Sequence, residues 1–288
     1  MSQLEIVKQV RTNDAVRESF GRLAQETFGL SFARWNQKGY WGDSYLPYSL
    51  WDGERVLANV SVNRMSAVLD GNPVRQIQLG TVMTAPDCRG KGYLRLLMDE
   101  VLKDWKEQCD GIYLYANSNV LDFYPKFGFV RAWEYAHRIP IRPEKGQIRK
   151  LNVDQPADRE ILHLAYAKSN LHSRLTVREN EGLLMFHCDS FLRDSIFYEE
   201  ENDAVVIADH RENELICWDV FGGGGLPLEK ILAPVALPGE GMALLGFTPT
   251  KPWEKPCMIV EDDFLFVLEE KQSIFTGEHL RMPILSHA

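Results

Sequence analysis

The chain has 288 residues, of which 45% are hydrophobic and 25% charged, so it has the length of two ordinary domains and the composition of a folded globular protein. No apolar run approaches the roughly 20 residues that cross a membrane, and the first residues have neither the pattern of a signal peptide nor that of a myristoylation site. The net charge of −9 falls mainly on the second half. This charge argues against a nucleic-acid partner, because phosphate contacts need clustered Lys and Arg. It predicts either a solvated acidic surface or attraction of a cationic substrate.

The cysteines and histidines give no sign of a disulfide framework or a metal site. The five cysteines are scattered and odd in number, which predicts reduced thiols and a cytoplasmic location. The seven histidines show no metal-ligand spacing, and His187 beside Cys188 is interpreted as incidental. We therefore expect no metal and no membrane partner, and the oligomeric state stays open.

The first half is predicted to alternate strands and helices. Asn13 or Thr12 is placed to cap the first helix, Gly29 to end it, and Asp52 with Gly53 to form a hairpin turn. Apolar residues at helical spacing between Leu94 and Trp105, with charged residues opposite as far as Glu107, predict an amphipathic helix after the glycine turn. The other predicted elements are a strand at 4–10, helices at 14–28 and 32–38, and strands at 45–51, 56–69, 74–84 and 112–115.

The turn between the strand at 74–84 and the following helix is the most informative segment. It places two glycines, Gly90 and Gly92, and two cations, Arg89 and Lys91, where a helix begins. Free N–H groups and the helix dipole already make that position favourable for an anion, so the cations predict a bound phosphate or pyrophosphate. A nucleoside-triphosphate loop would need Ser or Thr after the Lys, and a dinucleotide fingerprint would need three spaced glycines after the first strand. Neither pattern is present.

Two motifs in this region resemble those of the GCN5-related N-acetyltransferase (GNAT) family. The first is the run Arg89, Gly90, Lys91 and Gly92. Two residues after this run, Leu94 occupies the position at which the family has a small residue. The second resembles the family's aromatic-Tyr-x-Lys-x-Gly-Phe signature and covers residues 123–129. One helix and one strand separate the two motifs, as in the family, and the resemblance covers roughly residues 4–140.

The resemblance implies an α/β (α+β) GNAT fold, with a mixed central sheet flanked by helices and acetyl-CoA as donor. The strand at 78–84 would diverge from the one at 111–115, and the pantetheine arm would enter the gap like an added strand. Backbone groups of Thr81, Val82 and Met83 would bind this arm. The pyrophosphate would rest on the backbone of Arg89, Gly90, Lys91, Gly92, Tyr93 and Leu94.

The same resemblance assigns the chemistry. Tyr124 matches the tyrosine that protonates the departing thiolate, and Asn117 matches a position that steadies the cofactor. A backbone N–H of the strand at 81–83 would polarise the thioester carbonyl. No carboxylate lies in that strand, so the candidates for a general base are Glu26, Asp43 and a water chain.

The second half resembles a degenerate copy of the same layout. We expect domains at 1–140 and 151–288, with a linker at 141–150. Helices are predicted at 154–168, 177–191 and 227–235, and strands at 204–208, 214–221, 243–247, 257–260 and 264–268. Four glycines at 222–225 lack a neighbouring cation and are interpreted as a flexible turn rather than a phosphate site.

An active copy followed by a degenerate one is similar to the tandem enhanced-intracellular-survival acetyltransferases without their sterol-carrier-like domain. In that group a terminal carboxylate reaches the active site, which makes Ala288 a candidate there. Residues 282–287 are expected to form a strand or a frayed tail.

Three functions follow from these features. The preferred one is an acetyl-CoA-dependent N-acetyltransferase acting on a primary amine of a small molecule or peptide. The alternatives are a non-catalytic acyl-CoA-binding sensor or regulatory protein, and a scaffold whose second half mediates association. Aromatic residues after the first helix either bind a cationic acceptor through cation–π contacts or form core; they are Trp35, Tyr40, Trp41, Tyr45 and Tyr48.

Overall fold

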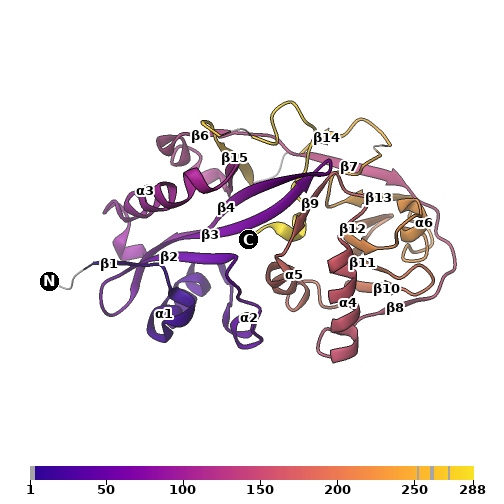
Figure 1. Ribbon diagram of the computed structural model, residues 1–288, viewed down its shortest axis with the longest axis horizontal. Coiled ribbons are helices and arrows are strands. Elements are labelled where there is room, and N and C mark those ends of the chain that lie inside the picture. Colours follow the sequence, from indigo (N-terminus) through magenta and orange to yellow (C-terminus); the bar gives the residue numbers. More distant parts are fainter. Residues whose placement is uncertain (1–3, 252, 260–262, 272) are drawn as a thin grey trace.

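The computed structural model describes residues 4–251, 253–259, 263–271 and 273–288, which form two adjoining halves, each built on a mixed sheet (Figure 1). The helices are α1 Asp14–Phe28, α2 Ala33–Gln37, α3 Tyr93–Trp105, α4 Pro156–Lys168, α5 Glu181–Cys188 and α6 Leu228–Leu232. The strands of the first half are β1 Glu5–Val7, β2 Tyr45–Trp51, β3 Val56–Leu69, β4 Asn72–Thr84, β5 Gly111–Ala116, β6 Phe129–Arg131 and β7 Tyr135–Pro140. Those of the second half are β8 Ile148–Lys150, β9 Leu175–Arg178, β10 Ile196–Glu199, β11 Ala204–Arg211, β12 Glu214–Gly222, β13 Met242–Leu245, β14 Cys257–Met258 and β15 Phe264–Leu268.

The first sheet has the strand order β1-β2-β3-β4-β5-β15-β6, with β9 paired to the far end of β3. Neighbours are antiparallel except β4 and β5, which run parallel and are connected through α3. The second sheet has the order β14-β7-β13-β12-β11-β10-β8, and its one parallel pair is β12 and β13, connected through α6. Both halves thus place a helix between two parallel strands in a largely antiparallel sheet, and the predicted fold class is confirmed.

Strands cross between the two halves: the first sheet takes in β15 and, at the far end of β3, β9 from the second half, and the second sheet takes in β7 from the first. β15 comes from the end of the chain but lies between β5 and β6 of the first sheet, whereas β7 leaves the first half and pairs with β13 in the second (Figure 1). The division of the chain at 140 and 150 therefore does not separate the sheets, although 141–147 does form an irregular connection between β7 and β8. The domain boundaries expected from the sequence, 1–140 and 151–288, stay a prediction.

Two predicted elements of the second half are corrected. The helix expected at 177–191 is shorter, since Leu175–Arg178 is a strand on the edge of β3 and the helix runs from Glu181 to Cys188. Glu179 has a φ of 57°, which interrupts any helix at that point. The segment expected to be a strand or a frayed tail is neither, because Leu285 and Ser286 are buried in a short 3₁₀ helix. Residue 260, at the end of a predicted strand, lies outside the described residues.

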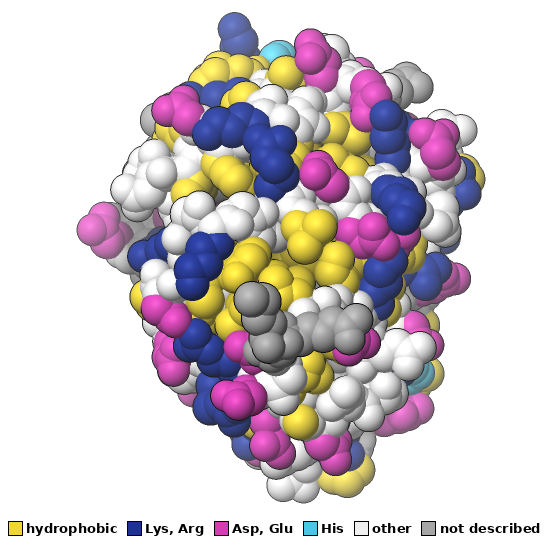
Figure 2. Space-filling view, turned by 90° about the vertical axis from the view of Figure 1, so that its left-hand side faces the viewer, with side chains coloured by type: hydrophobic (Ala, Val, Ile, Leu, Met, Phe, Trp, Pro, Cys, Tyr) yellow, Lys and Arg dark blue, Asp and Glu magenta, His cyan; other side chains and the backbone are white. Residues whose placement is uncertain are grey.

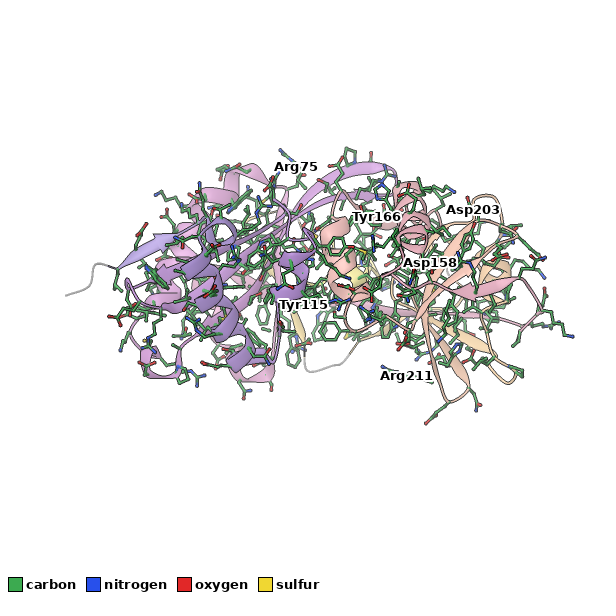
Figure 3. The ribbon with its side chains drawn as sticks, turned by 90° about the horizontal axis from the view of Figure 1, so that it is seen from below. Arg75, Tyr115, Asp158, Tyr166, Asp203 and Arg211 are labelled. Carbon is green, nitrogen blue, oxygen red and sulfur yellow. The ribbon has the colours of Figure 1, made fainter. Side chains whose placement is uncertain are left out.

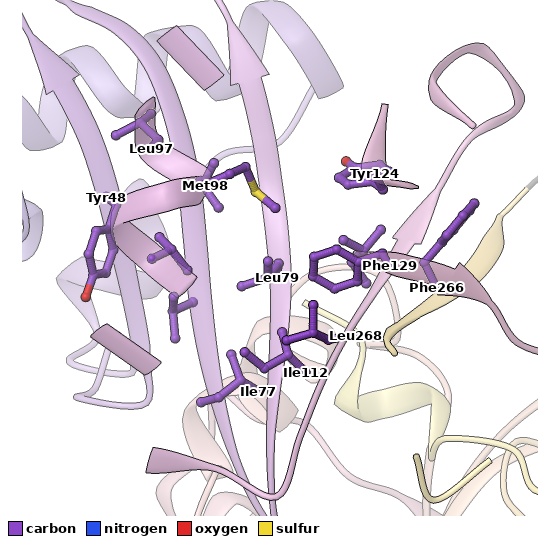
Figure 4. Packing of buried hydrophobic residues seen from close by; sticks show 14 of the residues in the cluster. Tyr48, Ile77, Leu79, Leu97, Met98, Ile112, Tyr124, Phe129, Phe266 and Leu268 are labelled. Atoms are coloured by element: carbon purple, nitrogen blue, oxygen red, sulfur yellow. The ribbon is translucent and has the colours of Figure 1, made fainter. Parts of the chain in front are cut away.

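Cores cover both faces of the first sheet. One core packs α3 against β2–β5 and takes in Phe266 and Leu268 from the exchanged strand (Figure 4). The opposite core packs α1 and α2 against the sheet and buries Trp35 and Trp41, which are 6% and 3% exposed. Asn13 caps α1 through its side chain and Gly29 ends it at φ 70°, as predicted.

A cluster of charges ties α2 of the first half to the second half. Arg34 and Lys38 reach Asp189, at 2.8 and 2.9 Å, and both also reach Asp154. Arg193 pairs with the same two carboxylates. These cations hold the pKa of Asp154 far below its usual range. Asp189 is almost fully buried, whereas Arg34 and Asp154 are about half exposed, so only the Asp189 end of this network is shielded from solvent.

No helix of the described segments is long and apolar enough to cross a membrane. The end of the molecule that carries β1 shows cations and anions interspersed around a central apolar area (Figure 2).

One buried carboxyl in the second sheet predicts a pH-dependent stability. Asp219 in β12 accepts hydrogen bonds from Asn170 and the Val220 N–H, and burial raises its pKa to about 7. A carboxyl raised in this way is protonated in the fold but not in the unfolded chain between about pH 4 and 7, so its stabilisation is present at low pH and lost as pH rises through that window. We expect Asp219→Asn to remove roughly 3 kcal/mol of the stability difference between pH 5 and pH 8. Urea unfolding of the wild type and of Asp219→Asn at pH 5 and pH 8 measures this difference in the free energy of unfolding. An equal pH dependence in the two proteins would contradict the raised pKa of Asp219.

Candidate active site

The cleft of interest opens where β4 and β5 stop pairing. Their parallel register runs from Gln76 opposite Gly111 to Leu79 opposite Leu114 and then ends, while β4 continues to Thr84 and β5 continues to Ala116, where only β15 on its other edge still pairs with it. The divergence expected from the sequence is thus present. It opens a cleft of about 620 Å³ between the two strands. The cleft is lined by Phe28, Gln78, Leu79, Gly80, Thr81, Val82, Leu94, Tyr115, Ala116, Asn117, Asn119, Val120, Asp122, Phe123, Tyr124, Lys126, Asp263, His287 and Ala288.

A β-bulge forms the wall of the cleft on β4. Gly80 pairs with Ser61 and Met83 with Asn59, so two residues of β4, Thr81 and Val82, face one residue of β3. Thr81 has a φ of 46°, which a β-branched residue adopts only when its surroundings impose it. A bulge removes main-chain groups from the ladder and aims them elsewhere, here beside the cleft.

Buried polar side chains hold this bulge in place. Asn59 donates from Nδ2 to the Thr81 carbonyl at 3.0 Å and accepts from Ser49 at 2.8 Å, and the Tyr45 hydroxyl bonds to Thr81 Oγ1 at 2.6 Å. Thr81 and Tyr45 were singled out from the sequence for other roles, whereas Asn59 and Ser49 were not. The signal was available, because Asn59, Ser61 and Asn63 alternate along an otherwise apolar strand and so share one face.

The turn before α3 leaves its amide groups free. Gly90 and Gly92 have φ of 76° and 80°, in the left-handed region that glycine tolerates, and Gly92 is the N-cap of α3. Within the described segments no acceptor is recorded for the N–H groups of residues 89–95, and the first bond of the helix runs from Leu96 to the Gly92 carbonyl. Arg89 and Lys91 are exposed and form no ion pair with any described residue. The turn therefore has the features of an anion site.

The remaining predicted cofactor residues divide by position. Thr81, Val82, Leu94 and Asn117 line the cleft, with Leu94 also packing against the first core. The side chain of Met83 is buried in the opposite core, so only its main chain is available to a cofactor. Arg89, Gly90, Lys91, Gly92 and Tyr93 lie outside the lining, in the turn and the first position of α3 just before Leu94.

Tyr124 lies at the edge of the first core and lines the cleft. It belongs to a short 3₁₀ helix at Tyr124–Phe127, and its ring centroid lies 6.3 Å from that of Phe129 and 6.0 Å from that of Phe266 (Figure 4). Burial raises the pKa of Tyr124 to about 12, so the phenol keeps its proton at neutral pH. Among the described residues no hydrogen-bond partner is recorded for its hydroxyl. The group is thus available to donate to a ligand in the cleft.

The chain segment at 287–288 also enters the cleft. The Ala288 N–H donates to Gln78 Oε1 at 3.0 Å, and Gln78 Nε2 donates to the Ala288 carbonyl at 3.4 Å. The His287 ring stacks on Tyr115 with 4.1 Å between centroids, at the place where the two halves meet (Figure 3). Burial and Arg281 lower the pKa of His287 to about 3, so its ring is neutral.

Two expectations about the acceptor side are not supported by the geometry. Glu26 and Asp43 do not line the cleft; Glu26 is exposed and Asp43 pairs with Arg11 at 2.6 Å. The carboxylates in the lining are Asp122 and Asp263, which the sequence analysis did not single out. The aromatic residues proposed as an acceptor wall are mainly core: Trp35, Trp41, Tyr45 and Tyr48 are buried, and Tyr40 is half-buried. Among the described residues, no three His, Cys, Asp or Glu side chains are placed to hold a metal ion.

Comparisons with known proteins agree with this architecture. Residues 11–132 match the family described as acetyltransferase (GNAT) domain. A probable N-acyltransferase from Enterococcus faecalis has a similar structure, with a TM-score of 0.62, 14% identity, and coverage of 92% of this chain and 71% of that one. Eis1 from Mycobacterium abscessus gives a TM-score of 0.56 at 14% identity, covering 93% and 74%. A GCN5-related N-acetyltransferase from Anabaena variabilis gives 0.56 at 12% identity, covering 92% and 72%. No curated protein sequence matches the chain significantly.

Residues 11–132 therefore match an acetyltransferase (GNAT) domain. Over most of the chain the fold is similar to those of the three structures named above, Eis1 among them.

Proposed function

We propose that the protein is an acetyl-CoA-dependent N-acetyltransferase that acetylates a primary amine of a small molecule or peptide. The observation that carries the proposal is the cleft lined by the strained bulge at Thr81, by Tyr124 and by Leu94 of α3, directly after the free turn at 89–92.

The cofactor fits this arrangement by its chemistry. The pantetheine arm carries amide groups that pair with strand edges, and the diverging β4 and β5 offer such edges. The pyrophosphate needs several donors and nearby cations, which the amides of 90–94 with Arg89 and Lys91 supply. Acetyl-CoA supplies the acetyl group as an activated thioester.

The chain's own groups would perform three tasks. An N–H at the bulge stabilises the oxyanion that forms when the amine attacks the thioester carbon. Tyr124 gives its proton to the departing sulfur, and its pKa of about 12 keeps that proton in place at neutral pH. The acidic side chains of Asp122 and Asp263 favour a cationic acceptor at the mouth of the cleft.

The main alternative is an acyl-CoA sensor without transfer activity. It is favoured by Leu94, which narrows the cleft where the family has a small residue, and by the lack of a carboxylate on β4. An amine screen with the wild-type protein separates the two functions: acetylated product supports the enzyme, whereas cofactor binding without product for any amine supports the sensor.

The cofactor site is tested first by calorimetric titration with acetyl-CoA. We expect one-to-one binding that Arg89→Ala weakens about tenfold, because one cation–phosphate contact is lost from an exposed site. Lys103→Ala is the matched control, since it removes an exposed cation from α3, the helix that follows the turn, and should leave the affinity unchanged. If Arg89→Ala and the wild type bind acetyl-CoA equally well, the turn does not bind its phosphates. Absence of acetyl-CoA binding to the wild type up to millimolar concentration would refute the proposed function.

A further inference from the structure

A small polar cavity lies where the two halves of the chain meet. Its walls come from the end of α4 and the loop after it, from β9, α5 and β12, and from residues 283–286. Because β9 pairs with β3, one wall belongs to the first sheet, whereas β12 belongs to the second. The cavity has a volume of about 20 Å³, which suffices for one occupant of the size of a water molecule.

One carboxyl group in this cavity has an oxygen without a partner. Asp219 is 6% exposed, and its Oδ1 accepts hydrogen bonds from Asn170 Nδ2 at 2.6 Å and from the Val220 N–H at 2.9 Å. No described residue is recorded as a partner of Oδ2. Because Asp219 lines the cavity and its Oδ1 is already engaged, Oδ2 is the oxygen left to face the space.

The walls supply no positive charge to this carboxyl. The lining contains no Lys, Arg or His, and β9 and residues 283–286 contribute no titratable side chain to it. The titratable groups that act electrostatically with Asp219 are Tyr166 on α4, Cys188 on α5 and Cys217 on β12, and burial raises the pKa of each, so all three are neutral at pH 8. An ionised Asp219 is therefore a buried charge that needs a counter-charge from outside the chain.

The rest of the lining offers neutral oxygen atoms. The amide nitrogens of Asn170 and Asn180 are both engaged, with Asp219 and with Asn63 at 3.2 Å, so these side chains offer an occupant their oxygens. Oxygen is the ligand that hard cations take. The buried polar residues that line the cavity beside Asp219 are 5–8% exposed: Ser169, Asn170, Thr176, Asn180 and Ser286.

Charge and size together select the occupant. The carboxylate excludes an anion, and a bound water would leave the charge of Asp219 unbalanced. Ca²⁺ and Mg²⁺ carry two charges, which one carboxylate does not balance, and Mg²⁺ keeps several waters for which the cavity has no room. Potassium and ammonium ions are similar in size to a water molecule and carry the single charge that Asp219 requires.

The cavity occupies the place in the second half that the candidate active site has in the first. Leu79 is the last residue of β4 that pairs with β5, and Cys217 is the last residue of β12 that pairs with β13. Two residues further lie Thr81 and Asp219, each beside a register shift against the neighbouring antiparallel strand. Where the first half has an open cleft at this position, the second half has a cavity for one ion with a carboxylate in its wall.

We propose that this cavity binds one potassium or ammonium ion, held by Asp219 Oδ2 and by the neutral oxygens of the lining, and that the ion stabilises the junction between β9 of the first sheet and β12 of the second. The ion supplies the counter-charge that the described side chains do not. The site is separate from the cleft between β4 and β5, and it does not depend on acetyl transfer.

Urea unfolding at pH 8 in different salts tests the site. Potassium, ammonium and choline chlorides are compared at equal concentration, because choline is too large for the cavity and keeps the ionic strength constant. We expect potassium or ammonium to raise the equilibrium constant of folding about tenfold over choline once its concentration is about ten times the dissociation constant. An effect of either ion supports the site, and the larger effect identifies the occupant.

Two carboxyl variants show whether the salt effect belongs to this cavity. Asp219→Asn should respond equally to the three salts. Asp209→Asn neutralises a half-buried carboxyl of β11 that lies outside the lining, and it should keep the wild-type difference. Equal folding constants of the wild type in all three salts, or a difference that persists in Asp219→Asn, would overturn the proposal.

The pH gives a second criterion. Burial raises the pKa of Asp219 to about 7, so at pH 5 the carboxyl is protonated and needs no counter-ion. The difference between potassium or ammonium and choline should therefore be lost at pH 5. A difference of the same size at pH 5 and pH 8 would contradict the role of the carboxylate.

Anomalous diffraction locates the ion without any variant. Rubidium is similar in size to both potassium and ammonium, so crystals of the wild-type protein grown in rubidium chloride are expected to show anomalous density in the cavity beside Asp219 Oδ2. Absence of this density would leave water as the occupant and overturn the proposal, even if Asp219→Asn did not fold.

Discussion

Replacing Tyr124 with phenylalanine is expected to lower kcat for amine acetylation about 100-fold and to leave the affinity for acetyl-CoA unchanged. General acids contribute about 10² to 10⁴ in rate, and the phenol of Tyr124 is a protonated group that lines the cleft. Because the ring is retained and no described residue is recorded as a partner of the hydroxyl, the fold should lose little stability. Steady-state kinetics and calorimetry on the two proteins measure both effects.

The same assignment fixes a pH dependence. With its pKa raised to about 12 by burial, Tyr124 stays protonated up to about pH 11, so its ionisation should cause no decline of kcat between pH 7 and pH 10. Tyr198→Phe in β10 of the second sheet is the matched control and should leave kcat unchanged. Undiminished kcat in Tyr124→Phe would show that another group, such as water, protonates the thiolate.

Those parts of the candidate site that are built from residues close together in the sequence could be predicted from it. The turn at 87–92 and the signature at 123–129 each lie within a few residues of chain; Tyr124 lines the cleft, and the turn directly precedes Leu94, which also lines it. The polar support of the bulge could not be read in the same way, because Tyr45, Asn59 and Thr81 come from three strands. Their contact depends on the register of β2, β3 and β4, which only the folded sheet fixes.

The fold shows the same limit on a larger scale. Periodicity and turn residues predicted most elements of the first half, since each is decided within one segment. The strand at 264–268 was also predicted, but its position between β5 and β6 could not be predicted. The apolar pattern of this strand is compatible with pairing in either sheet. The same holds for Asp263, His287 and Ala288, which reach the cleft through long-range packing.

The exchange of β15 and β7 gives the second large expected effect: residues 1–140 alone should not fold or bind acetyl-CoA. Without β15, the first sheet loses the strand between β5 and β6, together with the buried side chains of Phe266 and Leu268 from its core. The fragment would also expose β7, which normally pairs with β13 and β14. Removing even one such Phe costs about 3 to 5 kcal/mol, and losing a whole central strand exceeds the ordinary stability of a domain.

The control is to cleave the folded protein between its two halves, which breaks the chain but keeps every strand present. Residues 142–147 form an exposed connection, so a protease site inserted near Lys145 allows the chain to be cleaved after folding. The two pieces should stay together and keep binding acetyl-CoA, because each holds a strand of the other's sheet. Circular dichroism, size-exclusion chromatography and calorimetry on the cleaved protein and on the separately expressed fragment distinguish the cases. A fragment 1–140 that folds and binds alone would mean that β15 is dispensable and that the first half is an independent domain after all.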